Sequence, residues 1–174
     1  EFVALSKGYV VAEPGARGRT TQDANGKYTG KAPADIVDLK AAVRYLHFND
    51  SVMPGDANKI ISNGTSAGGA LSALIGGSGN NTDYEPYLKE IGAANGKDDI
   101  FAVSAYCPIT NLDHADMAYE WMFNGINNYK KLVMTGMIDF NVKRTLVEGT
   151  MTDSQIKLSK ELSAMFPSYI NSLG

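Results

Sequence analysis

Residues 59–68 read Lys-Ile-Ile-Ser-Asn-Gly-Thr-Ser-Ala-Gly, and the predicted fold follows mainly from these ten residues. Its first half is typical of a short buried strand, and its second half, from Gly64 to Gly68, matches the pattern Gly-x-Ser-x-Gly. In that pattern a tight strand-to-helix turn holds the serine in a strained backbone conformation, and the flanking glycines let neighbouring segments approach closely. Ser66 is therefore the predicted nucleophile.

The residues on either side of this stretch predict further helices and strands. Small residues at 67–75 indicate a helix packed against a sheet and ending at Gly76-Gly77. Upstream, a β-prone run at residues 9–12 predicts a strand followed by a long loop. Apolar residues then recur at helical spacing, at Ile36, Leu39, Val43 and Leu46. Polar residues fill much of the opposite face, at Asp35, Asp38, Lys40 and Arg44. This pattern predicts an amphipathic crossover helix.

The alternation of helices and strands continues to about residue 105. A helix is expected at residues 83–91 and a third parallel strand at residues 100–105, so the predicted fold class is α/β. After Pro108 the pattern changes, because helices are expected at residues 113–123 and 154–166 with only an irregular segment between them. The chain thus divides into a partial α/β core at residues 1–112 and a second region at residues 113–174.

The expected sheet is small for the helices that should cover it. Three parallel strands leave two open edges and too little surface for the crossover helices. The chain also begins on Glu1-Phe2-Val3-Ala4-Leu5, without a methionine, which is typical of the end of a helix that leads into a strand. We therefore expect an incomplete sheet, with further portions before Glu1 and after Gly174.

Composition excludes several classes of partner. The formal net charge is -3 and no basic block is present, so nucleic acid is not an expected partner. No apolar run approaches the roughly 20 residues that span a bilayer, so no membrane partner is expected. A single cysteine and two histidines argue against a disulfide framework and against a metal site, and no cofactor is expected.

A nucleophilic serine needs a base to accept its proton and an acid to orient that base. After Ser66 the only histidine is His114, and the adjacent Asp113 is poorly placed to orient it. The acid and the base are therefore expected beyond Gly174. The backbone N–H of Ala67, at a helix amino terminus, is the predicted oxyanion-hole donor, and a second donor is expected from an earlier loop.

Other residues have a functional and a structural interpretation. Arg17 and Arg19 could bind a substrate carboxylate, but loop arginines are more often solvated. Cys107 could be a thiol nucleophile, but a lone cysteine beside a core strand is more often a small buried apolar residue. His47 is interpreted as a helix-terminal residue. An aromatic cluster around Trp121 could cover a flat substrate or pack between helices.

Four stretches are distinctive when they are taken together. They are Gly-Tyr-Val-Val-Ala-Glu-Pro-Gly-Ala-Arg-Gly-Arg at 8–19, Gly-Thr-Ser-Ala-Gly-Gly-Ala-Leu-Ser-Ala-Leu at 64–74, Asp-Tyr-Glu-Pro-Tyr-Leu-Lys at 83–89 and Phe-Ala-Val-Ser-Ala-Tyr-Cys-Pro-Ile-Thr-Asn-Leu at 101–112. The chain thereby resembles, to about Phe123, the bacterial tannase and feruloyl-esterase group of α/β-hydrolases. The resemblance implies a three-layer sandwich with a mainly parallel sheet.

The same resemblance implies a function. It indicates a serine esterase that cleaves small-molecule esters of phenolic acids, of the galloyl or feruloyl type, through an acyl-enzyme on Ser66. It also implies a lid inserted after the third strand, so residues from about Asp113 onward would begin that lid. Residues 1–174 alone are then expected to lack the complete triad.

Three functions remain open from the sequence. The first is this serine carboxylesterase, with its remaining portions absent or carried on another chain. The second is a prolyl-oligopeptidase-like peptidase, which uses the same chemistry on amides. The third is a noncatalytic binding module on a hydrolase-like scaffold, although pure binding does not require the turn at Ser66.

Overall fold

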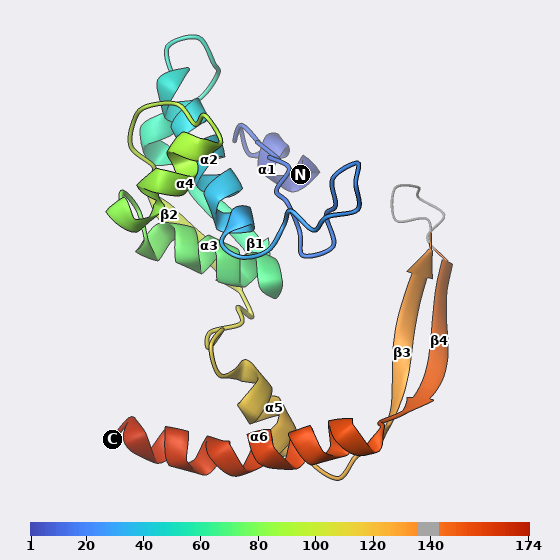
Figure 1. The fold of residues 1–174 in the computed structure, drawn as a ribbon. Helices are drawn as coiled ribbons and strands as arrows, with labels where there is room; N and C mark the ends of the chain where they lie inside the picture. Colours follow the sequence, from blue (N-terminus) through green and yellow to red (C-terminus); the bar gives the residue numbers. More distant parts are fainter. Residues whose placement is uncertain (136–142) are drawn as a thin grey trace. The chain divides into compact units, whose positions relative to one another are not determined.

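The structure is a computed structural model that describes residues 1–135 and 143–174 (Figure 1). The chain forms two compact units, Glu1–Thr110 and Asn111–Gly174, and each is described here by itself. In the described residues, no helix is long and apolar enough to cross a bilayer.

The first unit contains two parallel strands and several helices, of which α3 packs on both strands. Its helices are α1 (Phe2–Ser6), α2 (Ala34–Phe48), α3 (Ala67–Gly77) and α4 (Glu85–Glu90), with short 3-10 turns at Ala57–Lys59 and Thr82–Tyr84. Its strands are β1 (Ile61–Thr65) and β2 (Ala102–Tyr106). The strands pair in parallel from Ile61 opposite Ala102 to Thr65 opposite Tyr106. The predicted helices at α2, α3 and α4 and the second and third predicted strands are thereby confirmed.

Helix α3 covers one face of this sheet. Strand side chains alternate between faces, and Ser62 and Gly64 are the half-buried residues of β1. Ser62 Oγ donates a hydrogen bond to the carbonyl of Ser72 on α3, 3.2 Å away. On β2, Val103 approaches Gly76 so closely that a Cβ at Gly76 would overlap Val103 Cγ2. The small residues of α3 therefore let it lie directly on both strands.

The core of the first unit lies between α2 and α3. Its buried centre consists of Ile36 and Val43 from α2 and Ile75 from α3. Partly buried apolar side chains pack around it: Leu39, Ile60, Leu71, Leu74, Tyr84 and Ile100. The apolar spacing read from the sequence therefore identifies Ile36 and Val43 correctly, but the buried residues of α2 also include Val37, Lys40 and Arg44.

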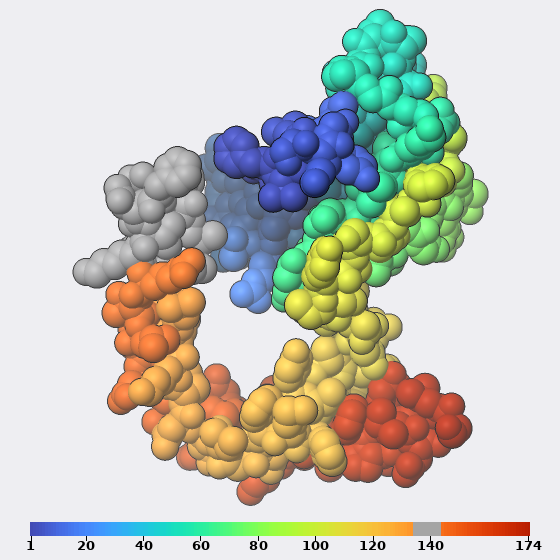
Figure 2. Space-filling model, turned by 180° about the vertical axis from the view of Figure 1, so that it is seen from behind, coloured from blue at the N-terminus to red at the C-terminus, as the bar shows by residue number. Residues whose placement is uncertain are grey.

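The predicted strand at residues 9–12 is wrong. In the described residues this segment is not part of a sheet, and Tyr9 and Val10 are both more than half exposed. Figure 2 shows this amino-terminal segment, in blue, on the surface of the first unit. A β-prone sequence becomes a strand only when a neighbouring strand takes up its backbone hydrogen bonds. Here β1 pairs with β2, so the described residues contain two of the three predicted parallel strands.

The second unit consists of two helices and a β-hairpin. The helices are α5 (Ala115–Phe123) and α6 (Asp153–Ser172), which pack on each other, and the antiparallel strands are β3 (Asn128–Thr135) and β4 (Lys143–Thr150). The prediction of an irregular segment between the helices is wrong for these strand residues. The predicted helix at 154–166 is confirmed and is longer than expected, because it continues past Pro167.

Candidate active site

Ser66 lies between the end of β1 and the start of α3. Its backbone angles are φ 59° and ψ -117°, in the left-handed half of conformational space that residues other than glycine rarely adopt. Its N–H donates a 3.0 Å hydrogen bond to the carbonyl of Tyr106, and its own carbonyl accepts one from the N–H of Ala70. The residue is exposed. The predicted strand, tight turn and helix around Ser66 are therefore present, and Ser66 sits at the carboxyl edge of the sheet.

The space around this turn is set by two glycines. A Cβ at Gly64 would overlap the carbonyl of Gly68 and lie 2.7 Å from Ser72 Oγ. A Cβ at Gly69 would lie 2.7 Å from the carbonyl oxygen of Tyr106 and 3.2 Å from Pro108 Cα. A Cβ at Gly68 would meet nothing within 4 Å, so the expected close approach there is wrong. The tight position lies one residue later, at Gly69, outside the sequence pattern.

Ala67 is the first residue of α3 and is exposed. The first N–H groups of a helix have no partner within the helix and carry the positive end of its dipole. This location suits a donor that stabilises negative charge beside Ser66. Its role in an oxyanion hole, like the role of Ser66 as nucleophile, stays a prediction.

Cys107 is exposed and has φ 37°, a second left-handed residue next to the turn. The expectation that it is a small buried residue is therefore wrong. It follows Tyr106, the last residue of β2, whose carbonyl accepts the Ser66 N–H. The backbone at the end of β2 thus contacts the backbone of the candidate nucleophile directly.

Neither histidine is arranged as the base of a triad. The ring of His114 packs on Tyr169 with a centroid distance of 4.3 Å, and its Nδ1 is buried without a hydrogen-bond partner among residues 1–135 and 143–174. An orienting acid would bond to that atom, so the structure gives no support to an Asp113–His114 pair. His47 lies in the last turn of α2, as predicted, and its Nε2 is 3.1 Å from the carbonyl of Asp99. Because Asp99 precedes β2 and Ser66 follows the parallel strand β1, His47 lies at the other end of the sheet.

Two of the acids that lie between Ser66 and His114 in the sequence, Asp98 and Glu85, have a structural role. Asp98 is fully buried and accepts hydrogen bonds from Lys40 Nζ at 2.8 Å and from Arg44 Nε at 2.9 Å. Arg44 also pairs with Glu85. The sequence predicts that Lys40 and Arg44 lie on the polar face of the crossover helix, opposite its apolar residues, whereas the structure buries both side chains. The sequence offers no local signal for this cluster, since its charges come from separate elements.

Burial raises the pKa of Asp98, but hydrogen bonds from Lys40, the N–H of Asn80 and Arg44 outweigh it and hold that pKa below its usual value. The carboxylate is therefore charged, and both of its oxygens accept structural hydrogen bonds. It is not free to orient a catalytic base.

Arg17 is held by Asp38. Its Nε lies 2.9 Å and its Nη2 2.7 Å from the two carboxylate oxygens, and these bonds hold the pKa of Asp38 below its usual value. Arg17 is thus a tether between the loop and α2, neither a solvated residue nor a free anion binder, whereas Arg19 is exposed.

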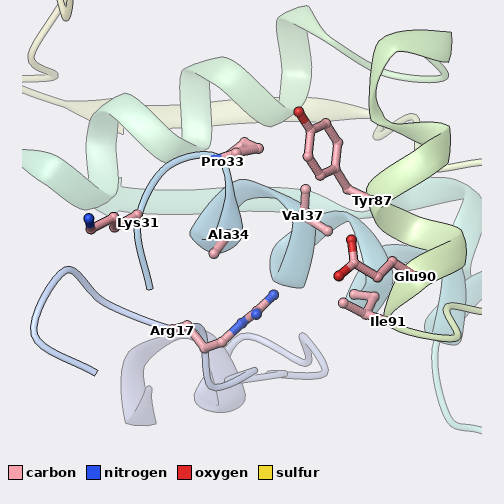
Figure 3. A pocket seen from close by; sticks show the side chains of 8 residues that line it. All are labelled: Arg17, Lys31, Pro33, Ala34, Val37, Tyr87, Glu90 and Ile91. Carbon is pink, nitrogen blue, oxygen red and sulfur yellow. The ribbon is translucent and has the colours of Figure 1, made fainter. Parts of the chain in front are cut away.

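A shallow cavity of about 170 Å³ lies beside this tether (Figure 3). Figure 3 shows Arg17 and Lys31 from the segment before α2, Val37 from α2, and Tyr87 and Glu90 from α4 around it. Both signs of charge line it, and no residue of the turn at Ser66 does. The cavity is therefore separate from the candidate active site.

In the second unit, Trp121 packs on Phe166 of α6 with ring centroids 5.5 Å apart. This contact supports the helix-packing interpretation of the aromatic cluster, although about half of the Trp121 surface is exposed. Among residues 1–135 and 143–174 no group of three histidine, cysteine or acidic side chains is arranged to hold a metal ion.

Comparison with known proteins identifies relatives for almost the whole chain. The family model BD-FAE matches residues 3–152. No curated protein matches the chain significantly.

Solved tannase structures are similar to this chain in sequence and in fold. Tannase from Fusobacterium nucleatum is 65% identical, with a TM-score of 0.81, over 99% of this chain and 37% of that protein. Tannase from Lactobacillus plantarum is 54% identical, with a TM-score of 0.82, over 98% of this chain and 37% of that protein. A tannin acyl hydrolase in complex with ethyl gallate is 55% identical, with a TM-score of 0.77, over 98% of this chain and 35% of that protein.

The chain therefore spans a little over a third of the length of the tannases that it matches. These similarities confirm the resemblance to tannases that the sequence indicates, and they imply an α/β-hydrolase-like fold. Because the family model matches residues 3–152, which is most of the chain, the chain belongs to the BD-FAE family.

Proposed function

We propose that the protein is a serine carboxylesterase that hydrolyses esters of phenolic acids, and that Ser66 is its nucleophile. The observation that carries the proposal is the backbone of Ser66, which is left-handed and exposed at the carboxyl end of β1. Strain of this kind persists where the surrounding structure imposes it, and it is concentrated at functional sites. The relatives give the substrate class, since they include a tannin acyl hydrolase in complex with ethyl gallate and another with 3,4-dihydroxybenzoate.

In the proposed reaction, Ser66 Oγ attacks the ester carbonyl carbon while its proton passes to a general base. The carbonyl oxygen becomes negatively charged, and the N–H of Ala67 donates a hydrogen bond to it. The ester C–O bond then breaks, the alcohol leaves with a proton, and an acyl group remains on Ser66. Water attacks this acyl-enzyme by the same route, which releases the phenolic acid and restores the hydroxyl.

We also propose that residues 113–174 begin a lid over the acyl site. The support is the change of architecture after β2, where an antiparallel hairpin and two helices replace the alternation of parallel strands and helices. Large apolar side chains of this unit are exposed, including Trp121, Met122 and Leu146. Exposed aromatic and apolar side chains suit a lid that covers a phenolic ring.

The test uses the full-length protein with methyl gallate, methyl ferulate and a fluorophosphonate probe. We expect both esters to be hydrolysed, and peptide mass spectrometry to locate the probe on Ser66. Ser66→Ala should lose turnover and labelling, since a serine nucleophile is worth many orders of magnitude in kcat. Ser62→Ala is the matched control on the strand that leads to Ser66, because the Ser62 hydroxyl donates a structural hydrogen bond to the Ser72 carbonyl.

The other outcomes separate the alternatives. Labelling of Ser66 with cleavage of peptide amides in place of esters would indicate a peptidase. Binding of gallate esters without turnover or labelling would indicate a noncatalytic module. Labelling at any residue other than Ser66 in folded protein would contradict the proposed nucleophile.

A further inference from the structure

Each of the two paired strands of the first unit is followed directly by a residue that has a positive φ and is not glycine. Thr65 at the end of β1 lies opposite Tyr106 at the end of β2, so the residues that follow, Ser66 and Cys107, leave the sheet at the same level. Their φ angles are 59° and 37°. Both φ angles are unfavourable for residues other than glycine, and such a conformation persists only where neighbouring contacts fix the backbone.

The first contact between the two strand ends is a hydrogen bond. The Ser66 N–H donates to the Tyr106 carbonyl at 3.0 Å. That carbonyl belongs to the same rigid peptide plane as the N–H of Cys107. With Pro108 held in place, any change in the φ of Cys107 rotates this plane and moves the acceptor away from Ser66.

The second contact is steric. The Tyr106 carbonyl and Pro108 Cα lie so close to Gly69 that a Cβ there would be 2.7 Å and 3.2 Å from them. The turn at residues 106–108 therefore rests on the first turn of α3. It contacts the segment that carries Ser66 at two points, one before and one after the start of the helix.

We propose that Cys107 is a positioning residue for Ser66, acting through its left-handed backbone and without its thiol. This inference rests on the proposed function, in which Ser66 is the nucleophile. The bond from Ser66 to Tyr106 fixes the backbone of the nucleophile and occupies its N–H. The N–H of Ala67 therefore has to serve as the oxyanion donor at this turn.

The proposal predicts which residues position 107 accepts. Glycine and asparagine adopt positive φ readily, alanine less so, and a β-branched residue hardly at all. We compare Cys107→Gly, Cys107→Asn, Cys107→Ala and Cys107→Val in the full-length protein, all of which lack the thiol. For each, the rate of fluorophosphonate labelling at Ser66, kcat and KM for methyl gallate, and Tm are measured.

We expect Cys107→Gly and Cys107→Asn to label within about threefold of the natural protein, a difference of about 0.65 kcal/mol in the activation free energy, because both residues adopt positive φ readily. Cys107→Val should lower the labelling rate and kcat by about tenfold or more, because small misplacements of a reacting group have large effects. KM should stay within about twofold, since ground-state binding is not altered. The labelling rate and kcat of Cys107→Ala should lie between those of Cys107→Gly and Cys107→Val. If Cys107→Val does not fold, Cys107→Ala is compared with Cys107→Gly instead.

Asn80→Val is the matched control. Asn80 also has a positive φ, 56°, but it lies in the turn after the far end of α3. We expect it to lower Tm while folded protein labels at the natural rate. Natural-rate labelling of Cys107→Val and Cys107→Ala would overturn the proposal, and so would a Cys107→Gly variant that labels as slowly as Cys107→Val. An unlabelled Ser66 in the natural protein would instead overturn the proposed function.

Discussion

Lys40 Nζ lies 2.8 Å from Asp98 Oδ1, and neither side chain has any exposed surface. Lys40 also donates to the carbonyl of Ser78, and Arg44 Nε bonds to the second oxygen of Asp98. Arg44 also forms an ion pair with Glu85 at the start of α4. Buried charges persist only when they are paired and hydrogen-bonded. The cluster therefore ties α2, the turn after α3, α4 and the segment before β2 into one unit.

Asp98→Asn tests this cluster. The substitution leaves Lys40 buried without a carboxylate, so we expect the free energy of unfolding to fall by about 3–5 kcal/mol. Asp99→Asn is the control, because Asp99 is less buried and bonds only to the side-chain amide of Asn80 and, through its carbonyl, to His47. The control should change stability by less than about 1 kcal/mol. Urea unfolding measures the free energy of unfolding of both variants. Equal decreases in the two variants would contradict a special role for Asp98.

The pH dependence of stability follows from the same carboxylates. The pKa values of Asp98 and Asp38 are lowered in the folded state, Asp98 by Lys40, Asn80 and Arg44 against the effect of burial and Asp38 by Arg17. A lowered folded pKa stabilises the protein above the unfolded pKa, about 3.9 for aspartate, and this stabilisation is lost as pH falls through the folded value. We expect stability to fall below about pH 4, with proton uptake on unfolding.

Asp38→Asn isolates one part of this effect, because Arg17 and Asp38 are partly exposed and their loss is tolerated more easily. The variant should show a shallower fall in the free energy of unfolding between neutral pH and pH 2, measured by urea titrations at several pH values. An unchanged slope would mean that the Arg17–Asp38 pair does not contribute.

Gly69→Ala and Gly68→Ala form a second matched pair. A methyl group at Gly69 would press on the Tyr106 carbonyl, whereas one at Gly68 meets open space. We expect Gly69→Ala to destabilise the protein by about 1–3 kcal/mol, as overpacking does, and Gly68→Ala to leave stability unchanged or raise it by up to about 1 kcal/mol. Thermal and urea unfolding distinguish the two variants. The reverse order would show that the close approach is not at Gly69.

The start of α6 offers a local test in the second unit. Thr152 and Gln155 form a reciprocal capping box, in which each side chain bonds to the backbone N–H of the other. Thr152→Ala should lower stability by about 1 kcal/mol. Ser168→Ala, at an exposed position within the same helix, should be neutral or slightly stabilising. Hydrogen exchange at the first turn of α6 should rise only in Thr152→Ala.

The features that the sequence predicts well are those with local causes. Helix α2 follows from apolar residues at helical spacing, and the turn at Ser66 follows from the order of an apolar run, a glycine-flanked serine and a small-residue helix. Both depend on residues within about one turn of each other. The same holds for α3, whose end at Gly76-Gly77 is read correctly.

The features that the sequence does not predict depend on distant partners. Lys40 looks like a solvated lysine until Asp98, 58 residues away, is placed beside it. Residues 9–12 have the composition of a strand but no neighbouring strand to pair with among the described residues. Polar and apolar residues do not alternate clearly along β3 and β4, and some polar residues lie opposite apolar ones, for example Lys131 opposite Val147. The left-handed backbone of Cys107 has no sequence signature at all.

The close approach of Gly76 on α3 to Val103 on β2 constrains how this sequence can change over evolutionary time. Since a single methyl group at position 76 would collide with the valine, the two positions are not free to drift separately. An alanine at position 76 becomes acceptable when position 103 carries a residue smaller than valine. We therefore expect substitutions at the two positions to occur together, with a larger residue at one and a smaller residue at the other. Among homologous chains, the volumes at these two sites should therefore vary inversely.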